Sequence, residues 1–193
     1  MKFRKLLILT AVLTLSFGTG VFADTLGQKV KVIFNKQDVS DIDATLIGKD
    51  AYVSAGALGD LVQGMVFWDD SAKKVSIYKP NVHMFLMSGS TSFGTVAKQK
   101  TQEFQVYAQI DNLQTSISSF KITITDPYGD STWIDGLSSG DANFPSDKDS
   151  FWFTSKKFSY EFKYTGKYTV RFWMKPTDGS TMQVVSEKTV ISK

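Results

Sequence analysis

The most regular pattern of apolar and polar positions lies on both sides of Gly166, where a large apolar or aromatic side chain occupies every second position. These eight side chains are Phe158, Tyr160, Phe162, Tyr164, Tyr168, Val170, Phe172 and Met174. Because successive residues of a strand point to opposite faces, a period of two predicts two strands. We expect the eight side chains to form one apolar surface that another sheet must cover, which favours an antiparallel sandwich.

Shorter patterns of the same kind predict that the whole of residues 81–193 is β-structure, after a linker at Lys79-Pro80-Asn81. Turn signals such as Asp126-Pro127-Tyr128-Gly129 separate the apolar runs. The other strands are expected at about 83–87, 103–110, 120–124, 133–134, 151–153 and 182–191. About seven short strands with turns between them are typical of a β-sandwich domain.

Residues 24–80 show mixed patterns instead. An alternating strand over 29–35 precedes a short helix over 54–64, for which Ser54 is a suitable N-cap and Gly64 a suitable stop. A hairpin is expected from Met65 to Lys79. These elements predict a small α+β module.

Two stretches of this module carry a family resemblance: Phe67-Trp68-Asp69-Asp70 with Lys74-Val75-Ser76-Ile77, and Tyr52-Val53-Ser54 before the helix. Residues 30–79 resemble the copper amine oxidase N-terminal-like (stalk) domain, although Ser54-Ala55-Gly56 stands where that family usually has Pro-Leu-Arg. The resemblance implies strands packed on one helix, used as a spacer or interaction unit. The oxidase chemistry belongs to a separate domain with several histidines, whereas this chain has one.

A second resemblance lies in Gly166-Lys167-Tyr168-Thr169-Val170. This run is similar to the G-x-Y-x-V strand of bacterial extracellular immunoglobulin-like domains, and the resemblance implies a corner contact by the tyrosine. The expected fold is therefore an α+β stalk-like module over 24–80 followed by an all-β immunoglobulin-like sandwich over 81–193.

The first 23 residues predict a secretory signal peptide. Lys2, Arg4 and Lys5 precede an apolar run over 6–15, and Val21-Phe22-Ala23 supplies small side chains at the positions that cleavage requires. A membrane anchor is the alternative, but the apolar run is shorter than the roughly 20 residues that span a bilayer. We expect a secreted protein without a transmembrane anchor after cleavage, attached to the cell wall, if at all, noncovalently.

Charge and cysteine content narrow the class of protein further. The chain has 22 Lys and Arg against 19 Asp and Glu, and three of the basic residues lie in the leader, which leaves 19 of each. A neutral mature chain gives no support for a nucleic-acid partner. Cysteine is absent, so no disulfide holds the fold and no lipid can be attached at a cysteine.

No catalytic or metal-binding pattern stands out. His83 is a lone histidine near a strand start, which favours a structural role. Asp69-Asp70 fits a hairpin turn, and the acidic loop over 135–149 matches no known calcium-loop spacing, so whether it binds calcium stays open. The nucleophile-elbow, P-loop and dinucleotide-binding patterns are absent. We expect no enzyme activity, no cofactor and no bound metal.

Exposed aromatic side chains are the candidate binding residues. Trp173 alternates with Phe172 and Met174 and so should point away from the core. The other candidates are Trp152, Trp133 and Tyr128. Large flat side chains stack on sugar rings or form protein interfaces, although Trp173 could instead pack under a loop or against the N-terminal module.

The expected function is that of an exported, non-enzymatic component of the cell envelope or extracellular matrix, acting as a spacer, adhesion or protein-interaction component. A carbohydrate-binding protein for wall or extracellular polysaccharide is the second hypothesis, and an accessory or inhibitor protein of another secreted enzyme is the third. A flat aromatic row with adjacent hydrogen-bonding groups would favour sugar. An exposed apolar patch or an unpaired edge strand would favour a protein partner or self-association.

Overall fold

The computed structural model describes residues 28–40, 42–179 and 181–193, so the expected signal peptide lies outside the described residues. The described chain consists mainly of strands, with one short α-helix. It divides into two compact units between Ser54 and Ala55. This division falls before the expected helix and hairpin, whereas the sequence indicated a linker at residues 79–81.

In the residues that the structure describes, the smaller unit contains short strands. β1 (Gln28–Lys29), β4 (Ala44–Ile47) and β5 (Asp50–Val53) form an antiparallel sheet in the order β1-β4-β5, while β2 (Ile33–Phe34) and β3 (Gln37–Asp38) form a hairpin. Asn35 and Lys36 connect β2 to β3, and both have positive φ angles, 49° and 66°. Two residues of this conformation twist a hairpin in the direction that strands favour.

The larger unit begins with the helix and hairpin that the sequence predicts. Helix α2 (Ala55–Val62) is followed by β6 (Met65–Asp69) and β7 (Lys74–Tyr78), which pair antiparallel. A Cβ atom on Gly59 would lie 2.1 Å from Cγ2 of Val66. A glycine that weakens the isolated helix therefore permits its close approach to β6.

Two contacts attach β6 to the sandwich of the same unit. Met65 is fully buried and belongs to the main apolar core. The side-chain amide of Gln183 accepts a hydrogen bond from the backbone N–H of Val66 at 2.8 Å and donates one to its carbonyl at 3.3 Å. The amide thus satisfies both backbone groups of one β6 residue.

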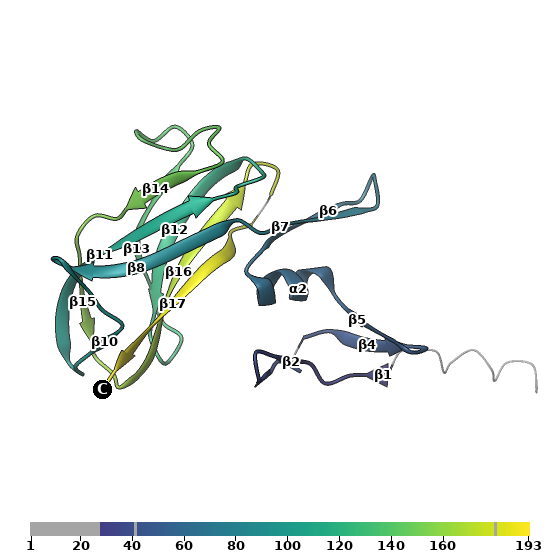
Figure 1. Ribbon diagram of the computed structural model, residues 1–193, viewed down its shortest axis with the longest axis horizontal. Helices are drawn as coiled ribbons and strands as arrows, with labels where there is room; N and C mark the ends of the chain where they lie inside the picture. The colour runs from purple at the N-terminus through teal and green to yellow at the C-terminus, as the bar shows by residue number, and fades with distance from the viewer. Residues whose placement is uncertain (1–27, 41, 180) are drawn as a thin grey trace, which may run out of the picture. The chain divides into compact units, whose positions relative to one another are not determined.

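The rest of the larger unit is a two-layered β-sandwich (Figure 1). One sheet has the order β10-β17-β16-β12-β13, formed by β10 (Thr95–Val96), β17 (Gln183–Ser192), β16 (Gly166–Pro176), β12 (Ile117–Thr125) and β13 (Ser131–Ser138). The other has the order β14-β11-β8-β9, formed by β14 (Phe151–Thr154), β11 (Lys100–Asp111), β8 (Asn81–Ser88) and β9 (Thr91–Ser92). β15 (Phe158–Phe162) also pairs with β11. All pairs are antiparallel except β10 with β17.

The two aromatic strands around Gly166 lie in different sheets. β15 pairs with β11, whereas β16 lies between β12 and β17. The expectation that their side chains form one shared surface is wrong, because the chain crosses from one layer to the other between them. Gly166 begins β16 at a φ of 138°, and a Cβ atom there would lie 3.0 Å from Pro127. Both the backbone conformation and the space therefore favour glycine at this crossing.

The crossing is fixed by Tyr168, whose side chain is fully buried. Its hydroxyl accepts the backbone N–H of Tyr164 at 2.8 Å and donates to the carbonyl of the same residue at 3.1 Å. Its ring packs edge-on against Phe162 of β15, with the ring centres 5.0 Å apart. The corner contact implied by the sequence is thus present.

Aromatic side chains also fill the centre of the sandwich. Phe120 of β12 packs against Phe172 of the same sheet at 5.3 Å and against Phe153 of the opposite sheet at 4.8 Å between ring centres. Phe144 and Phe151 complete this cluster. Since aromatic rings bury a large apolar area each, the cluster holds the two sheets together without disulfides.

We expect the substitution Tyr168→Phe to destabilise the protein by about 1–2 kcal/mol, because it leaves the backbone groups of Tyr164 without their partner. Urea unfolding would measure the loss. Tyr128→Phe is the control, since that side chain is 76% exposed, and it should change stability by less than about 0.5 kcal/mol. Equal stability of the wild type and Tyr168→Phe would contradict the role given to the corner.

Tyr160 should make the fold sensitive to alkaline pH. Partial burial, with smaller contributions from Tyr168 and Asp126, raises the pKa of its hydroxyl to about 12. A tyrosine in the unfolded chain has a pKa of about 10, so the unfolded chain loses this proton first as the pH rises. The stability that Tyr160 contributes is therefore complete below about pH 10 and is lost as the pH rises through about 12.

In thermal unfolding, the Tm of the wild type should fall over this pH window. Tyr160→Phe should show a shallower fall, because only the ionisation of Tyr160 has been removed. Identical slopes for the two proteins would contradict the raised pKa.

Candidate functional site

The four aromatic candidates from the sequence lie at three places on the sandwich. Trp133 on β13 and Trp173 on β16 belong to one sheet, and Trp152 on β14 belongs to the other. Tyr128 lies in the turn between β12 and β13, where its ring contacts that of Tyr164 at 4.7 Å between centres. The structure therefore brings together only Trp133 and Trp173 on one face.

Trp173 points away from the core as expected, because it lies between the fully buried Phe172 and Met174. Its side chain is half-buried, however, and not fully exposed. Its indole N–H donates to Oγ1 of Thr123 at 2.9 Å, and Nζ of Lys121 lies 5.3 Å from the ring centre. It also lines a shallow cavity with Val66 and Trp68 of β6. These contacts fix the ring and cover part of it, so Trp173 is a weaker platform for a ligand than the sequence suggested.

Trp152 lies on a different kind of surface, the outer face of the β14-β11-β8 sheet. It is 68% exposed, while Phe151 beside it is buried. On the next strands, Tyr107 of β11 stands directly opposite Phe85 of β8. Their rings are 5.3 Å apart between centres with planes only 7° apart. We call the outer surface formed by Trp152, Tyr107 and Phe85, with Gln105, Gln109 and His83 around them, the aromatic face.

The sequence identified only Trp152 among the aromatic residues of this face. Tyr107 alternates with the buried Val106 and Ala108, and Phe85 lies between the buried Met84 and Leu86. That alternation was a usable signal for outward side chains. Their meeting on one surface depends on the pairing of β11 with β8 and β14, which no local pattern specifies.

His83 lies on β8 opposite Gln109, at the border of the aromatic face. Its side chain is exposed, and no hydrogen bond or ion pair to another described residue fixes the imidazole ring. Its position on the outer surface makes it available to a ligand as a hydrogen-bonding side chain.

The aspartates considered as candidate site residues in the sequence form hydrogen bonds and ion pairs within turns and with the backbone. Oδ1 of Asp69 accepts hydrogen bonds from the Ser71 hydroxyl at 2.7 Å and the Ala72 N–H at 3.0 Å, and these bonds lower the pKa of Asp69. Asp70 forms an ion pair with Lys73 at 2.8 Å. The pair of aspartates thus stabilises the turn between β6 and β7.

Asp135, at the start of the acidic stretch, is buried within the sandwich. Its carboxylate accepts the backbone N–H of Gly136 at 2.9 Å and that of Lys156 at 2.7 Å. Lys156 follows β14 in the opposite sheet, so Asp135 connects the edge strand β13 to the other layer. Both carboxylate oxygens are therefore occupied by the fold.

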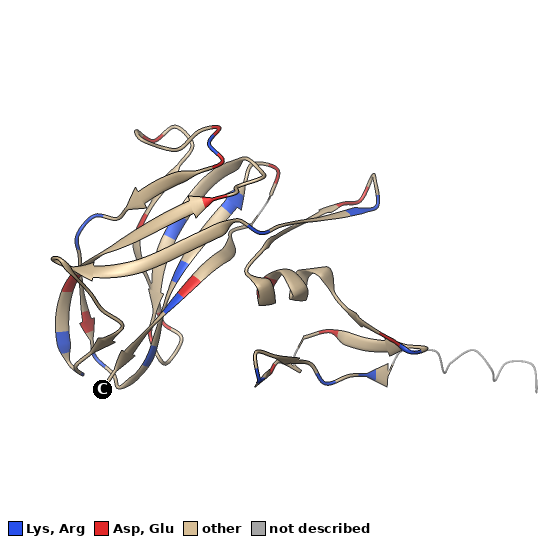
Figure 2. Ribbon diagram, viewed as in Figure 1, with Lys and Arg blue, Asp and Glu red and all other residues tan. Residues whose placement is uncertain are grey.

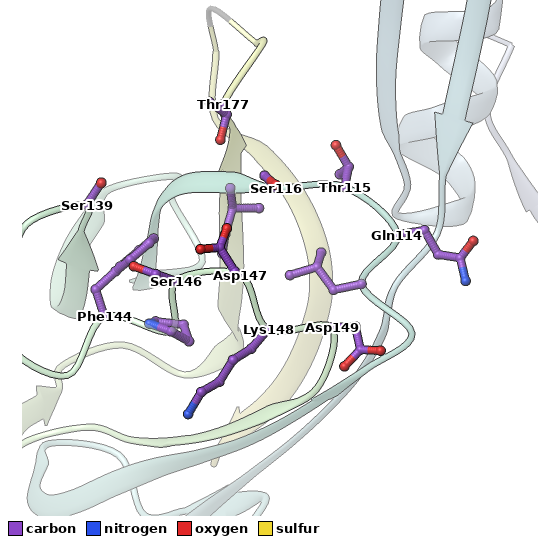
Figure 3. A pocket seen from close by; sticks show the side chains of 13 residues that line it. Gln114, Thr115, Ser116, Ser139, Phe144, Ser146, Asp147, Lys148, Asp149 and Thr177 are labelled. Atoms are coloured by element: carbon purple, nitrogen blue, oxygen red, sulfur yellow. The ribbon is translucent and has the colours of Figure 1, made fainter.

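Asp147 and Asp149, at the end of the acidic stretch, border an open depression of about 840 Å³ at one end of the sandwich. Residues 113–117 and 144–149, with Ser139 and Thr177, line it. Figure 3 shows that the Asp147 and Asp149 side chains extend in different directions and that Lys148 points away from Ser116. Among the described residues, no three His, Cys, Asp or Glu side chains lie close enough together to hold a metal ion.

No protein-family model matches the chain, and no curated protein matches its sequence. In the part of the chain that the structure describes, no helix has the length and apolar character needed to cross a membrane.

We expect calcium to leave the stability of the protein unchanged, because the loop carboxylates do not converge on one point. The test compares the Tm in calcium chloride with the Tm in EDTA. A ligand that binds only the folded state raises the Tm. A calcium-dependent rise that Asp147→Asn abolishes would contradict this expectation and assign the loop a metal site.

Proposed function

We propose that the protein is an exported, non-enzymatic component of the cell envelope or extracellular matrix that acts as a spacer, adhesion or interaction module. The observation that carries this proposal is the aromatic face, where Trp152, Phe85 and Tyr107 lie on the outer surface of a sheet. Binding modules that hold extended partners use such open surfaces, whereas small-molecule sites are usually concave.

The finer fold assignment supports the same class. We propose that residues 81–193 form an immunoglobulin-like domain, because Tyr168 makes its corner bond at the start of β16 and, apart from β10 with β17, the strands of the two sheets pair antiparallel. We further propose that residues 24–80 derive from a stalk-like module. Its hairpin lies in the same unit as the sandwich and supplies Met65 to the sandwich core, so we expect the hairpin to act as a support for the sandwich.

Carbohydrate binding is the second candidate function. It is favoured by one specific feature, the side-chain amides of Gln105 and Gln109 that alternate with the aromatic rings on the same face. A surface built only for an apolar protein partner would have fewer polar side chains at its centre.

Expression with the native leader tests export and envelope association together. We expect a secreted protein whose N-terminus is Asp24, measured by mass spectrometry, and whose purified form is retained on insoluble native envelope material. Retention would be measured by sedimentation, with an unrelated secreted β-sandwich protein as the control. Protein that stays in the cytoplasm, or secreted protein that is recovered entirely in the supernatant, would contradict the proposal.

A further inference from the structure

The pairing of three strands places the aromatic face in two rows. Trp152, Gln109 and His83 are directly opposite one another across β14, β11 and β8. Thr154, Tyr107 and Phe85 form the next row. Neighbouring strands lie about 4.8 Å apart, so each row spans roughly 10 Å. Aromatic groups therefore occur on all three strands of one continuous surface.

The inner face of the same strands holds these side chains in place. Val106, Ala108 and Ile110 alternate with the outward residues of β11 and are fully buried. A shift of register would expose them, which makes the outward direction of Tyr107 fixed. The parallel ring planes of Tyr107 and Phe85 add a second constraint, because each ring restricts the rotation of the other.

Polar groups beside the rings retain hydrogen-bonding capacity. The Gln109 amide donates one N–H to Asp111 at 2.8 Å, and the Gln105 amide donates one to the carbonyl of Ser155 at 2.8 Å. Each amide has two N–H donors and a carbonyl acceptor, so each retains groups for a ligand while its position is fixed.

None of the residues that form the aromatic face is Lys, Arg, Asp or Glu. β8 and β14 contain no charged residue and are drawn entirely in tan in Figure 2. On β11, Lys100 and Glu103 lie at one end, where Glu103 forms an ion pair with Lys157 at 3.1 Å, and Asp111 at the other end accepts the bond from Gln109. An uncharged surface with rings and amides complements an uncharged ligand that has apolar ring faces and hydroxyl groups at its edges.

The outer face of the opposite sheet lacks this combination. Arg171 bonds to Glu187 and also donates to Thr125 at 3.0 Å, and Lys121 lies over Trp173. Trp133 is 55% exposed there, but threonine and charged side chains surround it on β12 and β16. The chain thus contains its own matched control, an exposed tryptophan on the other outer face.

From these observations we propose that the aromatic face binds a polysaccharide of uncharged pyranose rings. Trp152 provides the main stacking surface, the Tyr107–Phe85 pair provides the second, and Gln105, Gln109 and His83 bond to ring hydroxyls. This inference rests on the proposed association with the envelope or matrix and names the class of ligand. A face that spans three strands suits a chain of linked rings better than a single sugar.

The test uses cellulose and chitin powders as probes, with the secreted form of the protein and its variants. The wild type should sediment with at least one of the two polymers. Trp152→Ala should weaken binding about tenfold, equivalent to ~1.4 kcal/mol, and the double variant Phe85→Ala/Tyr107→Ala should weaken it similarly. Trp133→Ala should bind like the wild type.

Salt provides an independent readout. Binding to an uncharged polymer should be equal in about 0.1 M and about 1 M NaCl, because screening acts on charges. The proposal is overturned if the wild type binds neither polymer, if Trp133→Ala loses as much affinity as Trp152→Ala, or if high salt releases the protein.

Retention on native envelope separates this inference from the proposed function. If the wild type and Trp152→Ala are retained equally, the aromatic face is not the site, although the proposed association stands. If Trp152→Ala abolishes retention but protease treatment of the envelope abolishes it too, the partner is a protein and the polysaccharide is excluded. If the wild type is not retained at all, the proposed function itself fails.

Discussion

The buried hydroxyl of Tyr168, bonded to both backbone groups of Tyr164, fixes the point where the chain passes from one sheet to the other. Without this crossing, β15 and β16 would continue as neighbours in one layer, and their apolar side chains would need a separate cover. With it, Phe162 and Tyr168 face each other across the sandwich and cover one another. The packing of the two layers therefore depends on a local contact at the start of β16.

Once the inner faces are fixed, the pleat of each strand decides what the outer faces display. On one sheet, Arg171 forms an ion pair with Glu187, and Lys121 lies over the ring of Trp173. On the other, Tyr107 and Phe85 stack on each other, and Trp152 is exposed on the same outer surface. The asymmetry of the two outer faces is thus a consequence of core packing, and of these two faces the aromatic face is the one that suits the uncharged ligand we propose.

The sequence predicted local structure better than it predicted the site. Alternation gave β16 and the outward direction of Trp173, and turn chemistry gave the hairpin of β6 and β7. The neighbours of Trp152 could not be predicted, because Phe85 and Tyr107 meet it only through strands far apart in the chain. The hydrogen bond that the Lys156 N–H donates to the buried Asp135 carboxylate could not be predicted for the same reason. The period of the apolar pattern indicates which side chains point outward, while the register of strand pairing decides which of them share a surface.

The most direct test of the account follows the indole N–H signals of the four tryptophans by NMR during titration with soluble oligosaccharides of cellulose and chitin. Ligand stacked on the aromatic face changes the environment of Trp152 and leaves that of Trp133, on the opposite outer face, unchanged. We expect a saturable shift of the Trp152 signal, with the Trp133 and Trp173 signals unaffected. No shift with either oligosaccharide, or a larger shift at Trp133, would contradict it.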